Sequence, residues 1–286
     1  MRLSARYDSA RFAKENWECQ EPFHAFDRDL VRDVYRRGRG EPVVLIPGLA
    51  GGHRLLAPLA RRLARNHRVI SIGLHGDRGW PGSAPNQTPA DHARDLADRL
   101  DRLGLERPTI VGVSFGAAVA LELAIGFPRC VGSLVLSGVE GTFRPNLATR
   151  IAATTLERFP LPKDNPFVNQ FFNILHGCRP TPGPLVDFIV RRCWETDQCI
   201  VARRLRGLEG FDVRDRLSSI DAPTLVIAGS RDVVIPPARQ KHLAETLNIS
   251  RFETIEGAGH VGFLTHRSEF ARLVARMVRE CQKHLC

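Results

Sequence analysis

No apolar run in this sequence approaches the roughly 20 residues that a helix needs to cross a bilayer. The first residues, Met1 to Asp8, also lack the apolar core of a secretory signal, and charged residues recur every few positions beyond them. We therefore expect a cytoplasmic protein with no stable membrane insertion.

Cysteine pairs with metal-binding spacing are missing as well. The seven cysteines are scattered, and no C-x-x-C occurs anywhere. An odd number of cysteines in a chain of 286 residues argues against a disulfide framework and fits a reducing compartment. We expect packing thiols rather than a zinc site, and we predict no metal and no organic cofactor.

Lysine is scarce: it occurs at only four positions, so the net charge of +10 comes almost entirely from arginine. An arginine excess can attract an anionic partner, but solvation of the surface is the interpretation that we favour. The arginines are spread along the whole chain and accompany no nucleic-acid motif, so we predict no nucleic-acid partner. An acidic carrier protein is an open alternative, and its candidate contacts are Arg191, Arg192, Arg203, Arg204 and Arg206.

Short β-branched runs alternate with longer amphipathic ones, which is the pattern of a parallel sheet covered by helices. The predicted strands are 43–46, 69–72, 109–113, 133–137, 224–228 and 251–255, with 30–36 as a candidate antiparallel strand. From about 142 to about 217 no clear β-type run appears, and the patterns are helical. We therefore predict an α/β core formed by residues 1–141 and 218–286, with residues 142–217 inserted as a helical cap.

The pentapeptide Gly112-Val113-Ser114-Phe115-Gly116 lies where a predicted strand meets a predicted helix. A nucleophilic serine needs this context, because a sharp turn exposes its hydroxyl and the flanking glycines leave room for the turn. The helix that begins at Phe115 also directs backbone N–H groups toward developing negative charge. Ser114 is therefore the predicted nucleophile.

A nucleophilic serine requires a base, and the base requires an acid that orients it. His260 follows a glycine-bearing loop after the last predicted strand, and Asp232 lies in a turn directly after the strand before it. Loops that follow parallel strands share one edge of a sheet, so Ser114, Asp232 and His260 can converge. Glu140, which also follows a strand, is the competing acid, and its position is the weaker match.

An oxyanion hole requires two backbone donors. The N–H of Phe115, the residue after the nucleophile, should supply one of them. The other should come from the glycine-bearing loop after the strand 43–46, where Leu49 is the expected donor and Ala50 the alternative.

Together these residues resemble the α/β-hydrolase superfamily, in its capped branch of esterases, C–C hydrolases and haloperoxidase-like enzymes. The resemblance covers about 43–283 and implies the α/β-hydrolase fold, a mostly parallel sheet flanked by helices with a helical cap. It is carried by the run from Val43 to Gly48, the pentapeptide around Ser114, the run from Ala222 to Asp232, and Gly257-Ala258-Gly259-His260.

The sequence departs from that family in three places. Pro47 stands where the family often has histidine, which should not alter donation by Leu49. Gly73 takes the place of an aspartate, and the turn over 74–83 is longer than usual. The nucleophile is serine rather than aspartate, which argues against the dehalogenase and epoxide-hydrolase branches.

The resemblance implies a serine hydrolase that cleaves carboxylic esters of small or medium acyl substrates through an acyl-enzyme, so a small-molecule ester is the expected partner. The same three residues would also support C–C bond hydrolysis, thioester cleavage or acyl transfer. A small-molecule receptor with residual hydrolysis is the alternative from another class. Slow single-turnover kinetics with tight ligand binding would reveal such a receptor.

Overall fold

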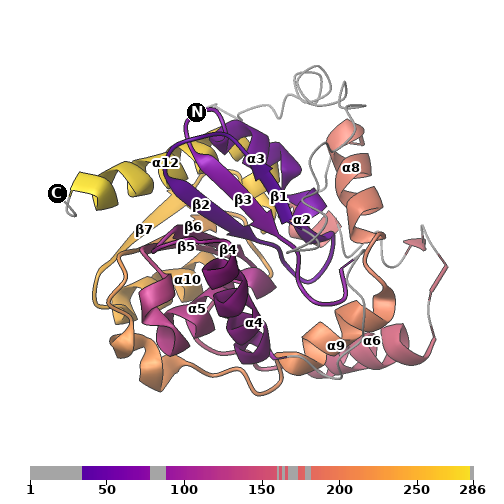
Figure 1. Ribbon diagram of the computed structural model, residues 1–286. Helices are drawn as coiled ribbons and strands as arrows, with labels where there is room; N and C mark the ends of the chain where they lie inside the picture. The colour runs from indigo at the N-terminus through magenta and orange to yellow at the C-terminus, as the bar shows by residue number, and fades with distance from the viewer. Residues whose placement is uncertain are drawn as a thin grey trace, which may run out of the picture.

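The computed structural model of the protein describes residues 34–77, 88–159, 161–162, 165–166, 173–177 and 182–283. The strands of this part form one seven-stranded sheet in the order β1-β3-β2-β4-β5-β6-β7 (Figure 1). β1 is antiparallel to β3, and all other neighbours are parallel. The strands are β1 (Val34–Arg37), β2 (Pro42–Ile46), β3 (Arg68–Ile72), β4 (Thr109–Val113), β5 (Ser133–Ser137), β6 (Thr224–Gly229) and β7 (Ser250–Ile255).

The predicted α/β architecture with a mostly parallel sheet is confirmed. Each of the six predicted parallel strands begins and ends within one residue of its expected position. β4 and β5 are buried along their whole length, which explains why their sequences read as continuous apolar runs rather than as alternation. Of the candidate antiparallel strand at 30–36, the part from Val34 belongs to β1, and the first four residues lie outside the described residues.

Helices cover both faces of the sheet (Figure 1). One face carries α3 (Ala57–Leu63) and α12 (Arg267–Lys283), and the other carries α4 (Pro89–Arg102), α5 (Phe115–Gly126) and α10 (Pro237–Thr246). A cluster of buried apolar side chains lies under each set. The short helices α2 (Gly52–Leu55) and α11 (Gly262–Thr265) follow the loops after β2 and β7, and two 3-10 turns span Pro128–Cys130 and Arg214–Ser219. In the described part of the chain, no helix has the length and apolarity to cross a membrane.

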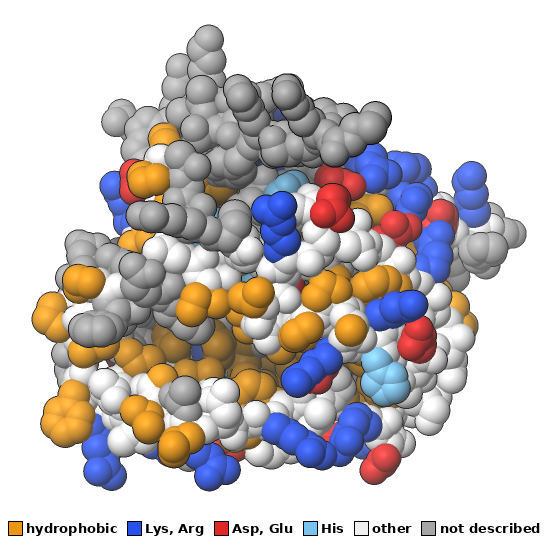
Figure 2. All heavy atoms as spheres, turned by 180° about the vertical axis from the view of Figure 1, so that it is seen from behind, with side chains coloured by type: hydrophobic (Ala, Val, Ile, Leu, Met, Phe, Trp, Pro, Cys, Tyr) orange, Lys and Arg blue, Asp and Glu red, His pale blue; other side chains and the backbone are white. Residues whose placement is uncertain are grey.

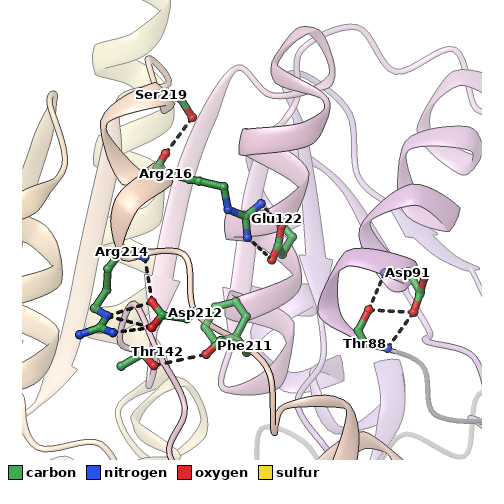
Figure 3. Close-up of polar contacts among 9 residues, drawn as sticks. All are labelled: Thr88, Asp91, Glu122, Thr142, Phe211, Asp212, Arg214, Arg216 and Ser219. Carbon is green, nitrogen blue, oxygen red and sulfur yellow. Dashed lines mark hydrogen bonds and ion pairs between the residues drawn. The ribbon is translucent and has the colours of Figure 1, made fainter.

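The start of α4 is fixed by a capping box (Figure 3). The hydroxyl of Thr88 accepts the N–H of Asp91 (3.2 Å), and the carboxylate of Asp91 accepts the N–H of Thr88 (3.0 Å). Pro89, whose ring presets the helical φ, occupies the first helical position. α4 packs against α5, which carries the candidate nucleophile at its beginning.

Residues 142–217, called the inserted segment below, separate β5 from β6. Its described helices are α6 (Leu147–Arg158), α8 (Pro184–Cys193) and α9 (Gln198–Gly207). α6 packs against α9, and α8 lies beside α2 (Figure 1). The ends of the segment meet at a neck, where Thr142 forms a β-bridge with Asp212 and the N–H of Val213 donates to the carbonyl of Gly141 (2.8 Å). Figure 3 shows Thr142 at this neck beside Phe211 and Asp212. The segment therefore leaves and re-enters the core at one point.

Candidate active site

Ser114 stands at the turn between β4 and α5. Its backbone has φ 53° and ψ −121°, a region that residues other than glycine rarely adopt. Its N–H donates to the carbonyl of Ser137 on β5 (2.8 Å), and its carbonyl accepts the N–H of Ala117 in the first turn of α5 (2.9 Å). These bonds on both sides of Ser114 hold its backbone in the strained conformation.

The two glycines of the pentapeptide are required by close packing. A Cβ on Gly116 would lie 2.4 Å from the carbonyl oxygens of both Ile46 and Pro47. A Cβ on Gly112 would lie 2.5 Å from the carbonyl oxygen of Gly116. Because no carbon atom fits at such distances, α5 can approach the end of β2 only with glycine at position 116, and β4 can turn into α5 only with glycine at position 112. This approach brings Ser114 beside the loop that follows β2.

His260 and Asp232 are in direct contact. The Nδ1 atom of His260 lies 3.0 Å from Oδ2 of Asp232, and both side chains are buried. Oδ1 of Asp232 accepts the N–H groups of Val234 (2.9 Å) and Ile235 (3.0 Å) in the turn after β6. A carboxylate held by several donors keeps one orientation, and it can therefore fix the ring and the tautomer of its histidine.

Gln240 of α10, which the sequence did not single out, completes the support of Asp232. It is fully buried, and its Nε2 donates to Oδ2 of Asp232 (3.1 Å) and to the carbonyl of Ile235 (2.7 Å). Its Oε1 accepts the N–H of Gly138 (2.8 Å). Gln240 therefore ties the turn of Asp232 to the loop after β5. The sequence around Gln240 contains no motif that would identify it, and its burial becomes apparent only in the structure.

Ser114 and His260 line the same cavity, which has a volume of about 640 Å³. The predicted oxyanion donors Leu49 and Phe115 line it as well. Most of the wall is apolar, and much of it comes from the inserted segment, including Phe143, Leu156, Trp194, Leu205 and Phe211. On the face opposite to that of Figure 1, hydrophobic side chains gather around a hollow (Figure 2). The geometry suits a small molecule with an apolar part that lies against the serine and the histidine.

The loop after β2 runs directly beside the serine. A Cβ added to Gly48 would lie 3.4 Å from the Cβ of Ser114. The N–H groups of Leu49 and Phe115 donate to no residue that the structure describes. An oxyanion hole requires two such donors, and Leu49 and Phe115 both line the cavity that contains the serine.

Two competing groups in the cavity are less suited to the chemistry. Cys193 of α8 lines the cavity, but burial raises the pKa of its thiol to about 12, so the thiol stays protonated at neutral pH. Glu140 also lines the cavity, but its carboxylate pairs with Nη1 of Arg239 at 3.0 Å. Both observations favour Ser114 and Asp232, whose catalytic roles stay predictions.

The turn after β3, where Gly73 replaces the family's aspartate, is described as far as Asp77; positions 78–83 of the long predicted turn lie outside the described residues. Asp77 is buried, and its Oδ2 accepts the N–H of Leu74 (2.8 Å). Two other histidines lie on loops after parallel strands, His53 after β2 and His75 after β3, and neither is among the residues that line the cavity. Burial lowers the pKa of His53 to about 4, so its ring is neutral at pH 7.

Comparison with known protein families identifies the family to which this chain belongs. The model of the family described as "Alpha/beta hydrolase family" matches residues 43–273. The chain belongs to the alpha/beta hydrolase family. The match includes both parts of the core as well as the inserted segment, and it therefore includes all three predicted catalytic residues.

Individual relatives of this hydrolase carry different names. It is 29% identical over 254 residues to a relative named carbamate hydrolase RutD from Pseudomonas savastanoi pv. phaseolicola, a match that covers 80% of the chain and 90% of that relative. It is 31% identical over 256 residues to polyketide synthase ThaQ from Burkholderia thailandensis; this covers 87% of the chain, which spans only 12% of the length of ThaQ. An esterase from Thermogutta terrifontis shares its fold with a TM-score of 0.77 at 23% identity, over 87% of the chain and 93% of the esterase.

We expect Gly138→Ala to impair the hydrolase by displacing His260. Gly138 has φ +70°, and an added Cβ would lie 2.6 Å from Cε1 of the His260 ring. The ring cannot stay in place, and a displacement of about 1 Å in a catalytic group can lower the rate by about 100-fold. Steady-state kinetics with an ester substrate, together with thermal unfolding, would measure the effect.

Gly104→Ala is the matched control for this prediction. Gly104 also has a positive φ, of +59°, but nothing lies within 4 Å of an added Cβ. The control should therefore lose about 1–2 kcal/mol of stability from backbone strain and keep its kcat. Equal kcat values in the two variants would show that the position of the His260 ring does not matter.

Proposed function

We propose that this hydrolase cleaves carboxylic esters through an acyl-enzyme on Ser114. The observation that carries the proposal is the buried hydrogen bond between Nδ1 of His260 and the carboxylate of Asp232, beside a cavity that His260 shares with Ser114. A nucleophile, a base and an orienting acid are the groups that this chemistry requires.

In the proposed reaction, Oγ of Ser114 attacks the ester carbonyl carbon while Nε2 of His260 takes the proton. The N–H groups of Leu49 and Phe115 stabilise the negative oxygen of the tetrahedral intermediate. His260 returns the proton to the leaving alkoxide, and the alcohol departs. A water molecule, deprotonated by His260, then attacks the acyl carbon, and His260 returns this proton to Oγ of Ser114 as the bond from Oγ to the acyl group breaks and the acid leaves.

We propose further that the inserted segment acts as a cap over this site. Its helices supply much of the apolar wall of the cavity. The volume of about 640 Å³ lies within the range of small-molecule sites, about 300–1,000 Å³. A medium-length acyl group therefore has both room and apolar surface to bind.

Hydrolysis of p-nitrophenyl esters with increasing acyl length tests the proposed substrate class. We expect kcat/KM to rise from acetate to about octanoate, by up to about fourfold per methylene, because each buried CH₂ contributes about 0.8 kcal/mol. A maximum at acetate would restrict the site to small acyl groups. If the folded protein turned over no ester, ester hydrolysis would be rejected, and C–C hydrolysis, a carrier-bound substrate or a receptor role would become the better explanations.

A second candidate is cleavage of an acyl thioester on an acidic carrier, which the similarity to a stretch of polyketide synthase ThaQ favours. Three of the five arginines considered for such a carrier form ion pairs inside the molecule: Arg192 with Glu195, Arg204 with Asp77 and Arg206 with Glu157. An acidic carrier could instead contact three exposed arginines that lie on or beside α6: Arg144, Arg150 and Arg158. Activity toward a carrier-bound thioester that falls as salt rises would support this candidate, and activity independent of salt would oppose it.

A further inference from the structure

Arg204 of α9 is one of the largest fully buried side chains, with 2% of its surface exposed. Its Nη1 donates to the carbonyl of Leu49 (2.8 Å). Its Nη2 donates to the carbonyl of His75 (2.9 Å) and to Oδ1 of Asp77 (2.9 Å). One guanidinium from the inserted segment therefore connects the loop after β2 with the turn after β3.

A second side chain of the inserted segment holds the same loop. Thr196, buried between α8 and α9, accepts the N–H of Gly51 through its hydroxyl (2.9 Å). Together with the bond of Arg204 to Leu49, this fixes both ends of the stretch 49–51. The bond to the Leu49 carbonyl orients the peptide between Leu49 and Ala50, and it therefore also restricts the backbone of Leu49, whose N–H is the predicted oxyanion donor.

The ion pair with Asp77 does not by itself account for a buried arginine. Removing two charges from water is costly, and apolar residues of similar volume often replace such pairs without loss of stability. An apolar side chain cannot hold two backbone carbonyls from different loops at once. The planar guanidinium can, because its N–H donors are arranged in a fixed fork.

We infer that Arg204 is a positioning residue for the reaction: with Thr196, it holds the loop after β2 so that the N–H of Leu49 stays aligned with the oxyanion. This inference rests on the proposed function, since Leu49 has this role only in acyl transfer. Arg204 is not among the residues that line the cavity, so it acts through the loop rather than on the substrate. The inserted segment then contributes to the chemical step as well as to the cavity wall.

Two variants weaken the hold on the loop while keeping the charge balance. Arg204→Lys keeps a cation beside Asp77 but lacks the planar fork. Thr196→Val removes the acceptor for Gly51 in a side chain of similar shape, at a residue that also lines the cavity. We expect kcat for a p-nitrophenyl ester to fall about 10- to 100-fold in each. For Arg204→Lys, KM should stay within about twofold and the pH dependence should not change, because the contact between Asp232 and His260 is untouched.

Arg206→Met is the matched control, since Arg206 lies on the same helix but pairs with Glu157 of α6. Its kcat should equal that of the wild type. A wild-type kcat in both folded variants, Arg204→Lys and Thr196→Val, would overturn the inference. So would an equal fall in kcat in the Arg206→Met control.

Reaction with paraoxon separates this inference from the proposed function. Oγ of Ser114 bonds to phosphorus, p-nitrophenolate leaves, and His260 takes the serine proton; the phosphoryl oxygen occupies the place of the oxyanion. Mass spectrometry should find the label on Ser114, formed more slowly in Arg204→Lys and Thr196→Val and at the wild-type rate in Arg206→Met. An unlabelled wild type would reject the proposed function and the inference together. Equal labelling rates in all proteins would leave the proposed function standing and reject the positioning role.

Discussion

Ser114→Ala is expected to lower kcat for ester hydrolysis by about 10⁴-fold or more, because it removes the only atom that forms the acyl-enzyme in the proposed mechanism. Alanine keeps a Cβ at the strained φ of 53° and leaves the backbone bonds to Ser137 and Ala117 in place. The thermal unfolding temperature should therefore stay near that of the wild type. Kinetics and thermal unfolding on the same preparation would separate lost chemistry from lost folding.

Cys193→Ala is the control for this prediction, because Cys193 carries the other potential nucleophile in the cavity wall. With a thiol pKa raised to about 12 by burial, Cys193 contributes no thiolate at neutral pH, and its removal should affect kcat far less. The opposite outcome, with activity kept in Ser114→Ala and lost in Cys193→Ala, would assign the nucleophile to the cysteine.

Asp232→Asn should lower kcat by about 10⁴-fold with little change in KM. The carboxylate of Asp232 holds Nδ1 of His260 at 3.0 Å and so selects the tautomer that leaves Nε2 free to accept a proton. An asparagine amide can donate to Nδ1 instead, which favours the wrong tautomer. Asp232 is not among the residues that line the cavity, so substrate binding should be largely unaffected. Steady-state kinetics across pH would measure both parameters.

Glu140→Gln distinguishes the two acids that the sequence left in competition. Glu140 pairs with Arg239 at 3.0 Å, and the side chain of that arginine is largely exposed. Loss of such a pair has little effect on stability. The partner of His260 is Asp232 and the partner of Glu140 is Arg239, so we expect a much smaller loss of kcat than in Asp232→Asn. A larger loss in Glu140→Gln would transfer the role of the acid to Glu140.

The sheet could be predicted because its central strands are buried on both faces, which leaves continuous apolar runs such as those of β4 and β5. The three candidate catalytic residues could also be found, because each follows a strand and glycines mark its turn. The pentapeptide glycines are local signals of close packing: Gly116 allows α5 to approach the end of β2, and Gly112 allows β4 to approach the first turn of α5.

The supporting residues could not be predicted in the same way, because their partners lie far away in the sequence. Arg204 and Leu49 are 155 positions apart, and Gln240 and Gly138 are 102 apart. In the sequence, Arg204 looks the same as Arg203 and Arg206 on the same helix. Only packing shows that one of them is buried against two loops while another pairs on the surface of the inserted segment.

The neck between Gly141 and Val213 makes the inserted segment a loop whose ends are already joined to each other. The entropic cost of closing a loop rises only with the logarithm of its length, by about 0.6 kcal/mol for each doubling. Insertions and deletions within the segment would therefore leave β5 and β6 in register at little cost to the core. In evolution such a segment can change in length and shape, and the apolar wall of the cavity with it, while Ser114, His260 and Asp232 stay in place. Arg204 limits these changes, because its bonds to Leu49, His75 and Asp77 require α9 to keep its position against the core.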